Sequence, residues 1–249
     1  MKTKLVITGI LAILITFSSI AQDARAIIKK ADDKSQGSSN KSVMSMSIVR
    51  PKYTRTIEFK NWSLGREYFM TYITAPAKDK GQVFMKHNTE MWSYSPSINR
   101  MIKLPPSMMS QGWMGSDYSN DDLVKQSSIV TDYDQKVIAE EEVEGRICYK
   151  IEMIPNLDAN VVWGKVIYWV DKELYIIAKG EYYDEEAYLV RTEVASGLKK
   201  FDGRELFSKI EIIPAEEEGN KTVIEFKSIV FNVDVKANFF SQQNMKRIR

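Results

Sequence analysis

Between residues 43 and 231 the sequence alternates apolar and polar side chains, and this period-two pattern constrains the fold more than any other feature. In VMSMSIV, for example, Met44, Met46 and Ile48 fall on one face of an extended strand. Eleven or twelve such stretches follow one another, rich in aromatic and β-branched residues and separated by short turn signals. Because short turns join antiparallel neighbours, the pattern predicts a mainly β fold, one long antiparallel meander that must curl or close.

One amphipathic helix is predicted before the strands. In DARAIIKKADD, which begins at Asp23, apolar residues recur at helical spacing at Ala24, Ile27, Ile28 and Ala31. The Asp23 side chain is placed to cap the first turn. The polar stretch SQGSSNKS then ends the helix.

The first residues have the layout of a secretory signal peptide. Lys2 and Lys4 precede an uncharged apolar run, and small residues follow as far as Ala21. The apolar run is too short to span a bilayer comfortably. We therefore predict a signal peptide over residues 1–21 that is cleaved after Ala21, with a retained anchor as the alternative.

Removal of this peptide leaves 228 of the 249 residues, a length that suits a single domain over residues 22–249. Without Lys2 and Lys4, 33 of the 35 basic side chains remain against 33 acidic ones. The mature chain is then neutral, and its charge gives no support to nucleic acid as a partner. The only cysteine, Cys148, rules out an intramolecular disulfide and is expected to be a small, half-buried strand residue.

An unusual loop interrupts the strands near the middle of the chain. LPPSMMSQGWMGSDYSNDDL, residues 104–123, combines prolines and glycines with large apolar side chains, and it is long for a connection between strands. Its apolar residues are expected to form the underside of a flap that closes one mouth of the curled sheet. The alternative, which the residues alone leave open, is that they plug the end of a solid core. These residues are Met108, Met109, Trp113 and Met114.

Small and polar residues of the same loop are assigned to shaping this flap. Ser119 and Asp122 bracket a capping box that would open a short helix. Asp117 is expected to accept backbone hydrogen bonds that fix the turn after Gly115. Arg100 and Lys103, just before the loop, are expected to pair with its acids Asp121 and Asp122, or else with a phosphate. The predicted flap-shaping residues are Gly112, Gly115, Ser116, Asp117, Ser119 and Asp122.

Three stretches give the chain a resemblance to a known family. GQVFMKHNTEMWSYSPSINR, residues 81–100, resembles the W-x-Y-x-P strand of the outer-membrane lipoprotein-sorting proteins, which are related to the periplasmic carrier LolA. WMGSDYSNDDL is similar to the F-M-G-S-D-F-S-x-x-D-L motif of one subgroup, and VDVKANFFSQQNMKR is similar to the family's ending. The MGSD motif is the most specific of the three, and the similarity covers nearly all of the mature chain.

The resemblance implies an unclosed antiparallel β-barrel of about eleven strands, with an N-terminal helix and a lid over an apolar cavity. It also implies a periplasmic carrier that binds acyl chains of a lipoprotein or lipid and moves them toward the outer membrane. An inner-membrane transporter and an outer-membrane acceptor would then be partners, and a monomer without cofactor or metal is expected. Besides the four loop residues above, the residues expected to line the cavity are Met44, Met46, Ile48, Phe69, Met85 and Trp92.

Other functions are alternatives to the carrier. The cavity could sense a lipid for an envelope-stress regulator, or serve a membrane lipid exporter, and one sequence does not separate these. An enzyme has less support: the single histidine, His87, is expected in a turn, and no G-x-S-x-G motif is present. One histidine and one cysteine argue against a zinc site of the usual kind.

Overall fold

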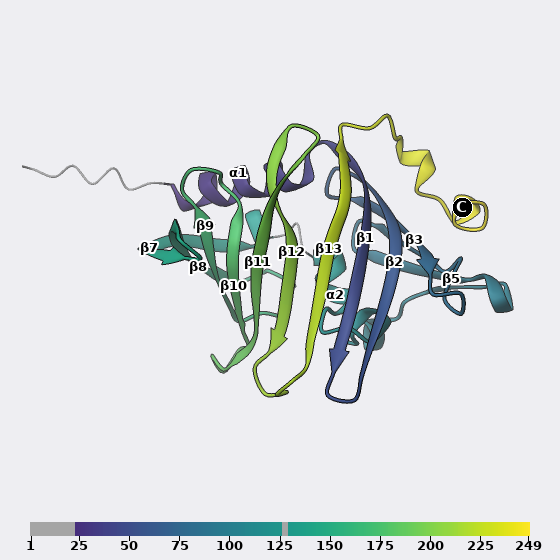
Figure 1. The fold of residues 1–249 in the computed structure, drawn as a ribbon, viewed down its shortest axis with the longest axis horizontal. Coiled ribbons are helices and arrows are strands. Elements are labelled where there is room, and N and C mark those ends of the chain that lie inside the picture. Colours follow the sequence, from purple (N-terminus) through teal and green to yellow (C-terminus); the bar gives the residue numbers. More distant parts are fainter. Residues whose placement is uncertain (1–22, 126–128) are drawn as a thin grey trace, which may run out of the picture.

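The computed structural model describes residues 23–125 and 129–249 (Figure 1). The predicted signal peptide, residues 1–21, lies outside the described residues. Among the helices that are described, none combines the length and the apolar character that crossing a membrane requires.

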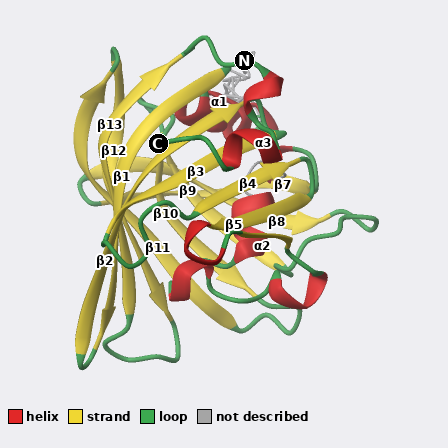
Figure 2. Cartoon of the chain, turned by 90° about the vertical axis from the view of Figure 1, so that its right-hand side faces the viewer, coloured by secondary structure: helices red, strands yellow, loops and turns green. Residues whose placement is uncertain are grey.

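Thirteen antiparallel strands form one strongly curved sheet, as Figures 1 and 2 show from two sides. The strands before the loop are β1 (Ser39–Arg50), β2 (Tyr53–Leu64), β3 (Tyr68–Ala75), β4 (Val83–His87), β5 (Glu90–Ser95) and β6 (Arg100–Lys103). Those after it are β7 (Tyr133–Val143), β8 (Arg146–Pro155), β9 (Lys165–Asp171), β10 (Ile177–Tyr183), β11 (Leu189–Phe201), β12 (Arg204–Pro214) and β13 (Lys221–Phe231). The predicted mainly β, unclosed antiparallel fold is therefore confirmed.

The strand order differs from the single meander that the sequence predicted. The order across the sheet is β6-β5-β4-β3-β2-β1-β13-β12-β11-β10-β9-β8-β7, so the first and last strands are neighbours. In that central pair Met46 lies opposite Ile224. The two free edges are β6 and β7, which are consecutive in the chain. The loop between them therefore runs from one edge of the sheet to the other.

One strand, β6, was not predicted from the sequence pattern. It has only four residues, and a short 3-10 helix, η1 (Pro96–Ile98), separates it from β5. Four residues between Pro96 and Pro105 are too few to show a period of two.

The predicted N-terminal helix is α1 (Ala24–Gln36), and its start is capped as expected. The Asp23 carboxylate accepts hydrogen bonds from the backbone N–H groups of Arg25 and Ala26, at 3.0 and 3.4 Å. Its apolar stripe packs against the inner side of β7–β10, with Ile27 and Ile28 buried. The helix thus covers one half of the concave face (Figure 1).

The loop from residue 104 to residue 125, which we call the flap, covers the other half. It contains η2 (Pro106–Met108), η3 (Trp113–Gly115) and α2 (Asn120–Lys125). Its buried residues Leu104, Trp113 and Val124 pack with apolar side chains of β1 to β5, among them Met46 and Phe59. Figure 1 shows α2 behind the central strands, on the concave side of the sheet.

The convex face of β2–β6 has a separate core. After β13 the chain forms η5 (Ala237–Phe239) and α3 (Gln242–Met245) and crosses this face. Phe240, Met245 and Ile248 pack there with residues such as Met70 and Tyr72 of β3. Because side chains alternate along a strand, β3 contributes Phe69 and Thr71 to the inner face and Met70 and Tyr72 to the outer one.

Candidate functional site

A cavity of about 360 Å³ lies between the inner face of the sheet, α1 and the flap. This volume is within the range of pockets that hold small apolar ligands. Strands from both halves of the sheet line it, together with Ile28 of α1 and Leu123 of the flap. Its apolar wall from β12 and β13 consists of Leu206, Phe207, Ile210, Ile212, Ile224, Phe226 and Ile229.

Four of the predicted cavity residues line this cavity: Met44, Met46, Phe69 and Trp113. Ile48, Met109 and Met114 pack in the same apolar cluster, beside the cavity and not in its wall. Met108 is partly buried, and its backbone carbonyl accepts a hydrogen bond from Asn120 Nδ2 at 2.9 Å.

The predicted placement of Met85 and Trp92 in the cavity is wrong. Both belong to the outer cluster that Phe240 and Met245 cover. Met85 and Trp92 are cross-strand partners, so they share a face, and their chain neighbours Lys86 and Met91 occupy the opposite one. The sequence pattern assigned the strands correctly here and the face incorrectly, because both faces of β4 and β5 are buried and alternation does not mark the inner side.

Trp113 fixes the flap to the inner face. Its side chain is 4% exposed and meets the rings of Phe59 and Phe84 edge-on, with centroids 5.4 and 5.5 Å apart. Its indole N–H is buried without a hydrogen-bond acceptor among the described residues.

Asp117 of the MGSD motif joins the flap to the centre of the sheet. Its carboxylate accepts hydrogen bonds from Arg50 Nη1 and Nη2, at 3.1 and 2.9 Å, and from Thr222 Oγ1 at 2.7 Å. Arg50 ends β1 and Thr222 lies in β13, so one carboxylate ties the flap to the two central strands. The predicted backbone hydrogen bonds to this side chain are not the ones observed, because the carboxylate reaches the sheet and not its own turn.

Two glycines allow the tight turn on either side of Trp113. A Cβ on Gly112 would lie 2.2 Å from the carbonyl oxygen of Ser116, so no larger residue fits there. Gly115 has a φ of 83°, in the left-handed region that favours glycine. Ser116 Oγ accepts from the Tyr118 N–H and donates to the Tyr118 carbonyl. These contacts lie within the turn, and the flap-shaping role of the residues stays a prediction.

The predicted capping box at the start of α2 is confirmed. The Asp122 N–H donates to Ser119 Oγ at 3.0 Å, and the Ser119 N–H donates to Asp122 Oδ2 at 2.8 Å. The sequence predicted that Asp121 and Asp122 pair with Arg100 and Lys103. The structure shows other partners. Lys103 pairs with Glu90, and Asp121 pairs with Lys125.

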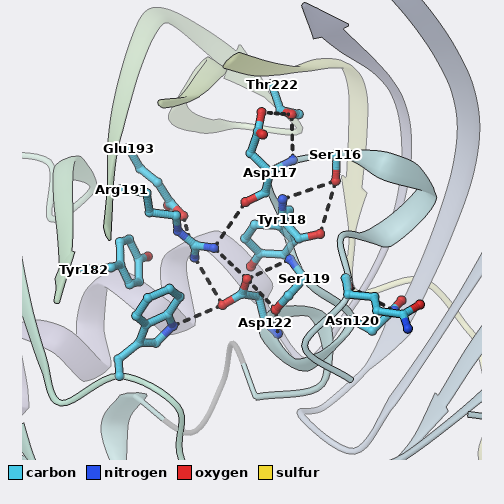
Figure 3. A network of polar contacts seen from close by, with 12 residues as sticks. Ser116, Asp117, Tyr118, Ser119, Asn120, Asp122, Tyr182, Arg191, Glu193 and Thr222 are labelled. Carbon is cyan, nitrogen blue, oxygen red and sulfur yellow. Dashed lines mark hydrogen bonds and ion pairs between the residues drawn. The ribbon is translucent and has the colours of Figure 1, made fainter. Parts of the chain in front are cut away.

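Asp122 also forms the second attachment of the flap, to Arg191 of β11 (Figure 3). Arg191 Nη1 and Nη2 donate to the two carboxylate oxygens at 2.6 and 3.2 Å, and Trp163 Nε1 donates to Oδ1 at 3.1 Å. Both ionic side chains are nearly inaccessible, 5% and 6% exposed. Removing one partner of such a buried pair typically costs about 3–5 kcal/mol.

Aromatic rings and a second acid complete the surroundings of Arg191. Its guanidinium lies over the rings of Tyr182, Trp163 and Tyr118, at 4.2, 4.8 and 5.2 Å from their centroids. Glu193 Oε1 lies 3.0 Å from Arg191 Nη2, and burial raises the pKa of this carboxyl. The charge of Arg191 is thus met by two acids of the protein, while its Nε–H has no acceptor among the described residues.

The other charged side chains in the cavity wall are paired as well, with one exception. Lys86 of β4 has no hydrogen bond and no ion pair among the described residues. The paired groups are Asp32 with Arg66, Asp121 with Lys125, Lys179 with Glu181, and Arg191 with Asp122 and Glu193.

The residues considered for an enzyme lie apart from the cavity. His87, at the end of β4, is exposed and stacks on Tyr68 with centroids 4.8 Å apart. Cys148 is fully buried, and burial raises the pKa of its thiol to about 11, so the unreactive thiol is the form present at neutral pH. No group of three or more metal-ligating side chains occurs within residues 23–125 and 129–249.

Comparisons with known proteins agree with this architecture. A family model described as "Uncharacterized protein" matches residues 65–247. A crystal structure of a DUF1329 family protein from Desulfovibrio piger superposes with a TM-score of 0.82 at 24% identity, over 90% of this chain and 98% of that one. No curated protein gives a match.

Two further solved structures share the fold. A domain assigned to outer membrane lipoprotein sorting, from Vibrio parahaemolyticus, superposes with a TM-score of 0.79 at 22% identity, over 91% of this chain and all of that one. A LolA superfamily protein from Nitrosomonas europaea gives 0.75 at 22% identity, over 89% and 99%. The sheet and its covering elements are therefore those of a LolA-like fold.

Proposed function

The chain belongs to the family whose model matches residues 65–247, and from that membership and its LolA-like fold we propose that it is a periplasmic lipid carrier. In this proposal a signal peptide, residues 1–21, is removed after Ala21. The domain formed by residues 22–249 then binds acyl chains of a lipid or lipoprotein and moves them toward the outer membrane.

The observation that carries the proposal is the cavity under the flap. Its wall of isoleucines, phenylalanines and methionines offers hydrocarbon a place out of water, and each buried methylene contributes about 0.8 kcal/mol. A chain of a dozen methylenes would supply enough free energy for retention without any covalent step. A space with apolar walls under the flap is what the proposed carrier requires.

The flap supports a carrier because it has a defined set of contacts that can be made and broken together. Asp117 and Asp122 hold it to β1, β13 and β11, while Trp113 closes over the apolar wall. Release of a bound chain requires these contacts to part, as for other lids that cover a ligand.

The similarity to a domain assigned to outer membrane lipoprotein sorting supports this cargo class and its compartment. A carrier of this kind needs a donor and an acceptor. We therefore include an inner-membrane transporter and an outer-membrane acceptor as partners in the proposal, with the carrier acting as a monomer.

Lipid analysis of the protein purified from its own periplasm tests the proposal. Organic extraction, or native mass spectrometry under gentle conditions, is expected to show reproducible acyl-chain species bound to the protein. A protein that is consistently free of lipid contradicts the proposed function.

A variant that fills the cavity sharpens the test. Met44 lines the cavity and is only partly buried, so Met44→Trp is expected to occupy the space and reduce co-purified lipid at least severalfold. Met101→Trp is the matched control, because Met101 is a partly buried methionine of the outer cluster. Equal loss of lipid in both variants, or in neither, argues against this cavity as the binding site.

A further inference from the structure

Lys86 is the one charged residue of the cavity wall whose position the carrier proposal does not yet explain. It lies in β4, opposite Phe69 of β3 and Met91 of β5, on the inner face of the sheet. Its side chain lines the cavity, and the residue is only 6% exposed. Both of its cross-strand partners are therefore apolar.

No ion-pair partner of this ammonium occurs among the described residues. Within the part of the chain that the structure describes, Lys86 makes no hydrogen bond and no ion pair, whereas the other charged side chains of the wall do. Glu67 acts on it electrostatically, but this glutamate is exposed and makes no ion pair with Lys86. A charge on a residue this little exposed carries a desolvation cost, which an anionic partner would offset.

The ammonium nevertheless keeps its proton at neutral pH. Burial lowers the pKa of Lys86 to about 8, with a smaller opposing effect from Glu67. The cavity therefore presents a positive charge with free hydrogen-bond donors beside an apolar wall.

We propose that Lys86 anchors the anionic head group of an amphiphile whose hydrocarbon chain occupies the cavity. This inference rests on the proposed carrier function and names its ligand class. A carboxylate or phosphate oxygen supplies the acceptor and the negative charge that Lys86 lacks. The methylenes that follow the head group then meet Phe69 and the apolar wall beyond it.

Binding of three probes with the same sixteen-carbon chain tests this inference. The delipidated mature protein is titrated with palmitate, hexadecyl phosphate and hexadecanol in a fluorescence displacement assay. At least one of the two anions is expected to bind about tenfold or more tightly than the neutral alcohol, because a hydrogen-bonded charge pair contributes that much. The better of the two identifies the head group as a carboxylate or a phosphate.

Substitution of Lys86 is expected to remove this preference. Lys86→Met keeps the length of the side chain and should bind all three probes with the affinity of the alcohol, whereas Lys86→Arg should keep the preference for the anion. Lys60→Met is the matched control: Lys60 follows Phe59, whose side chain lines the cavity, so its own side chain points to the other face of β2. This control should behave like the unmodified protein.

The outcomes separate the two proposals. Equal affinity for all three probes in the unmodified protein, or an anion preference that survives in Lys86→Met, overturns the role of Lys86 and leaves the carrier intact. Failure of the unmodified protein to bind any of the probes counts against the carrier itself.

Discussion

Lys86 and Arg191 are both basic residues buried in the wall of one cavity, and they differ in what surrounds them. Arg191 has two carboxylates and three aromatic rings around its guanidinium, so its charge is used within the protein. Lys86 has apolar cross-strand partners and makes no ion pair among the described residues, although the exposed Glu67 acts on it electrostatically. Arg191 holds the flap to the sheet, whereas the charge of Lys86 is available for the anionic head group that we propose.

The burial of Lys86 has a consequence for stability that needs no ligand. The pKa is about 8 in the folded chain and near 10.5 in the unfolded chain, so between these values the unfolded state binds more protons. Stability should therefore rise with pH across this window. Lys86→Met removes the buried charge, and it is expected to raise the free energy of unfolding at pH 7 by roughly 2–3 kcal/mol and to abolish the rise.

Denaturant unfolding at pH 7 and pH 10 checks this expectation. The quantity of interest is the difference between each variant and the unmodified protein at each pH, since other lysines and tyrosines titrate as well. Lys60→Met should show no such difference. A Lys86→Met protein that is less stable at pH 7 would mean that the ammonium has a stabilising partner.

At the scale of elements, the flap combines an apolar underside with a polar attachment. Trp113 fills a place between two rings of the sheet, while Asp117 and Asp122 make ion pairs with Arg50 and Arg191. These attachments hold the flap against β1 and β11 in the structure. The hydrogen bonds within the turn of the flap are expected to depend on these two ion pairs.

Asp117→Asn is expected to loosen the flap without unfolding the sheet. The substitution removes the charge that pairs with Arg50, at an estimated cost of about 2 kcal/mol. Amides inside the turn, such as those of Trp113 and Ser116, should then exchange with solvent roughly 10- to 100-fold faster, while amides of β8 and β9 keep their rates. Hydrogen-exchange mass spectrometry measures both.

Asp134→Asn is the control for this experiment, since Asp134 is an exposed aspartate of β7 and loses the same charge. Its exchange rates should not change in the flap. Uniform acceleration across the sheet in Asp117→Asn would show that Asp117 contributes to global stability and not to the closure of the flap.

The sequence predicted the local features of these elements well. The period-two stretches identified twelve of the thirteen strands, and the Asp23 cap and the Ser119–Asp122 capping box form as expected. These features depend on residues that are close together in the chain, so they can be predicted from short sequence patterns. The pairing of β1 with β13 joins distant segments, and no local pattern specifies it.

The candidate site was predicted only in part for the same reason. Met44, Met46 and Trp113 were identified by their apolar character and place in the chain, and they line the cavity. Lys86 and Arg191 were not identified, because each is one of 35 basic residues and only the folded sheet shows which are buried. A lysine between apolar residues in QVFMKH, with both faces of the strand otherwise apolar, was the one available signal.

At the scale of the whole molecule, the two faces of the sheet have different tasks. The inner face leaves space beside its apolar side chains, whereas the outer face of β2–β6 is filled by the segment after β13. Met245 of α3 is fully buried in that outer cluster. Stability and ligand affinity should therefore respond to different substitutions.

Met245→Ala is expected to lower the free energy of unfolding by roughly 2–4 kcal/mol and to leave the affinity for a cavity ligand unchanged. Met44→Trp is expected to lower the affinity for a cavity ligand and to leave the free energy of unfolding unchanged. Denaturant unfolding and the displacement assay, applied to both variants, check the separation. A loss of affinity in Met245→Ala that matches its loss of stability would show that the two faces are coupled.

A curved sheet that never closes on itself keeps two margins of unpaired amide and carbonyl groups, and such margins attract strands from other molecules. Here one margin, β6, is only four residues long, with exposed Arg100 and Lys103 at its ends. The other, β7, carries exposed Asp134, Lys136, Glu140 and Glu142 along its length. Charge and brevity thus protect both edges of the unclosed sheet against pairing with strands of other molecules.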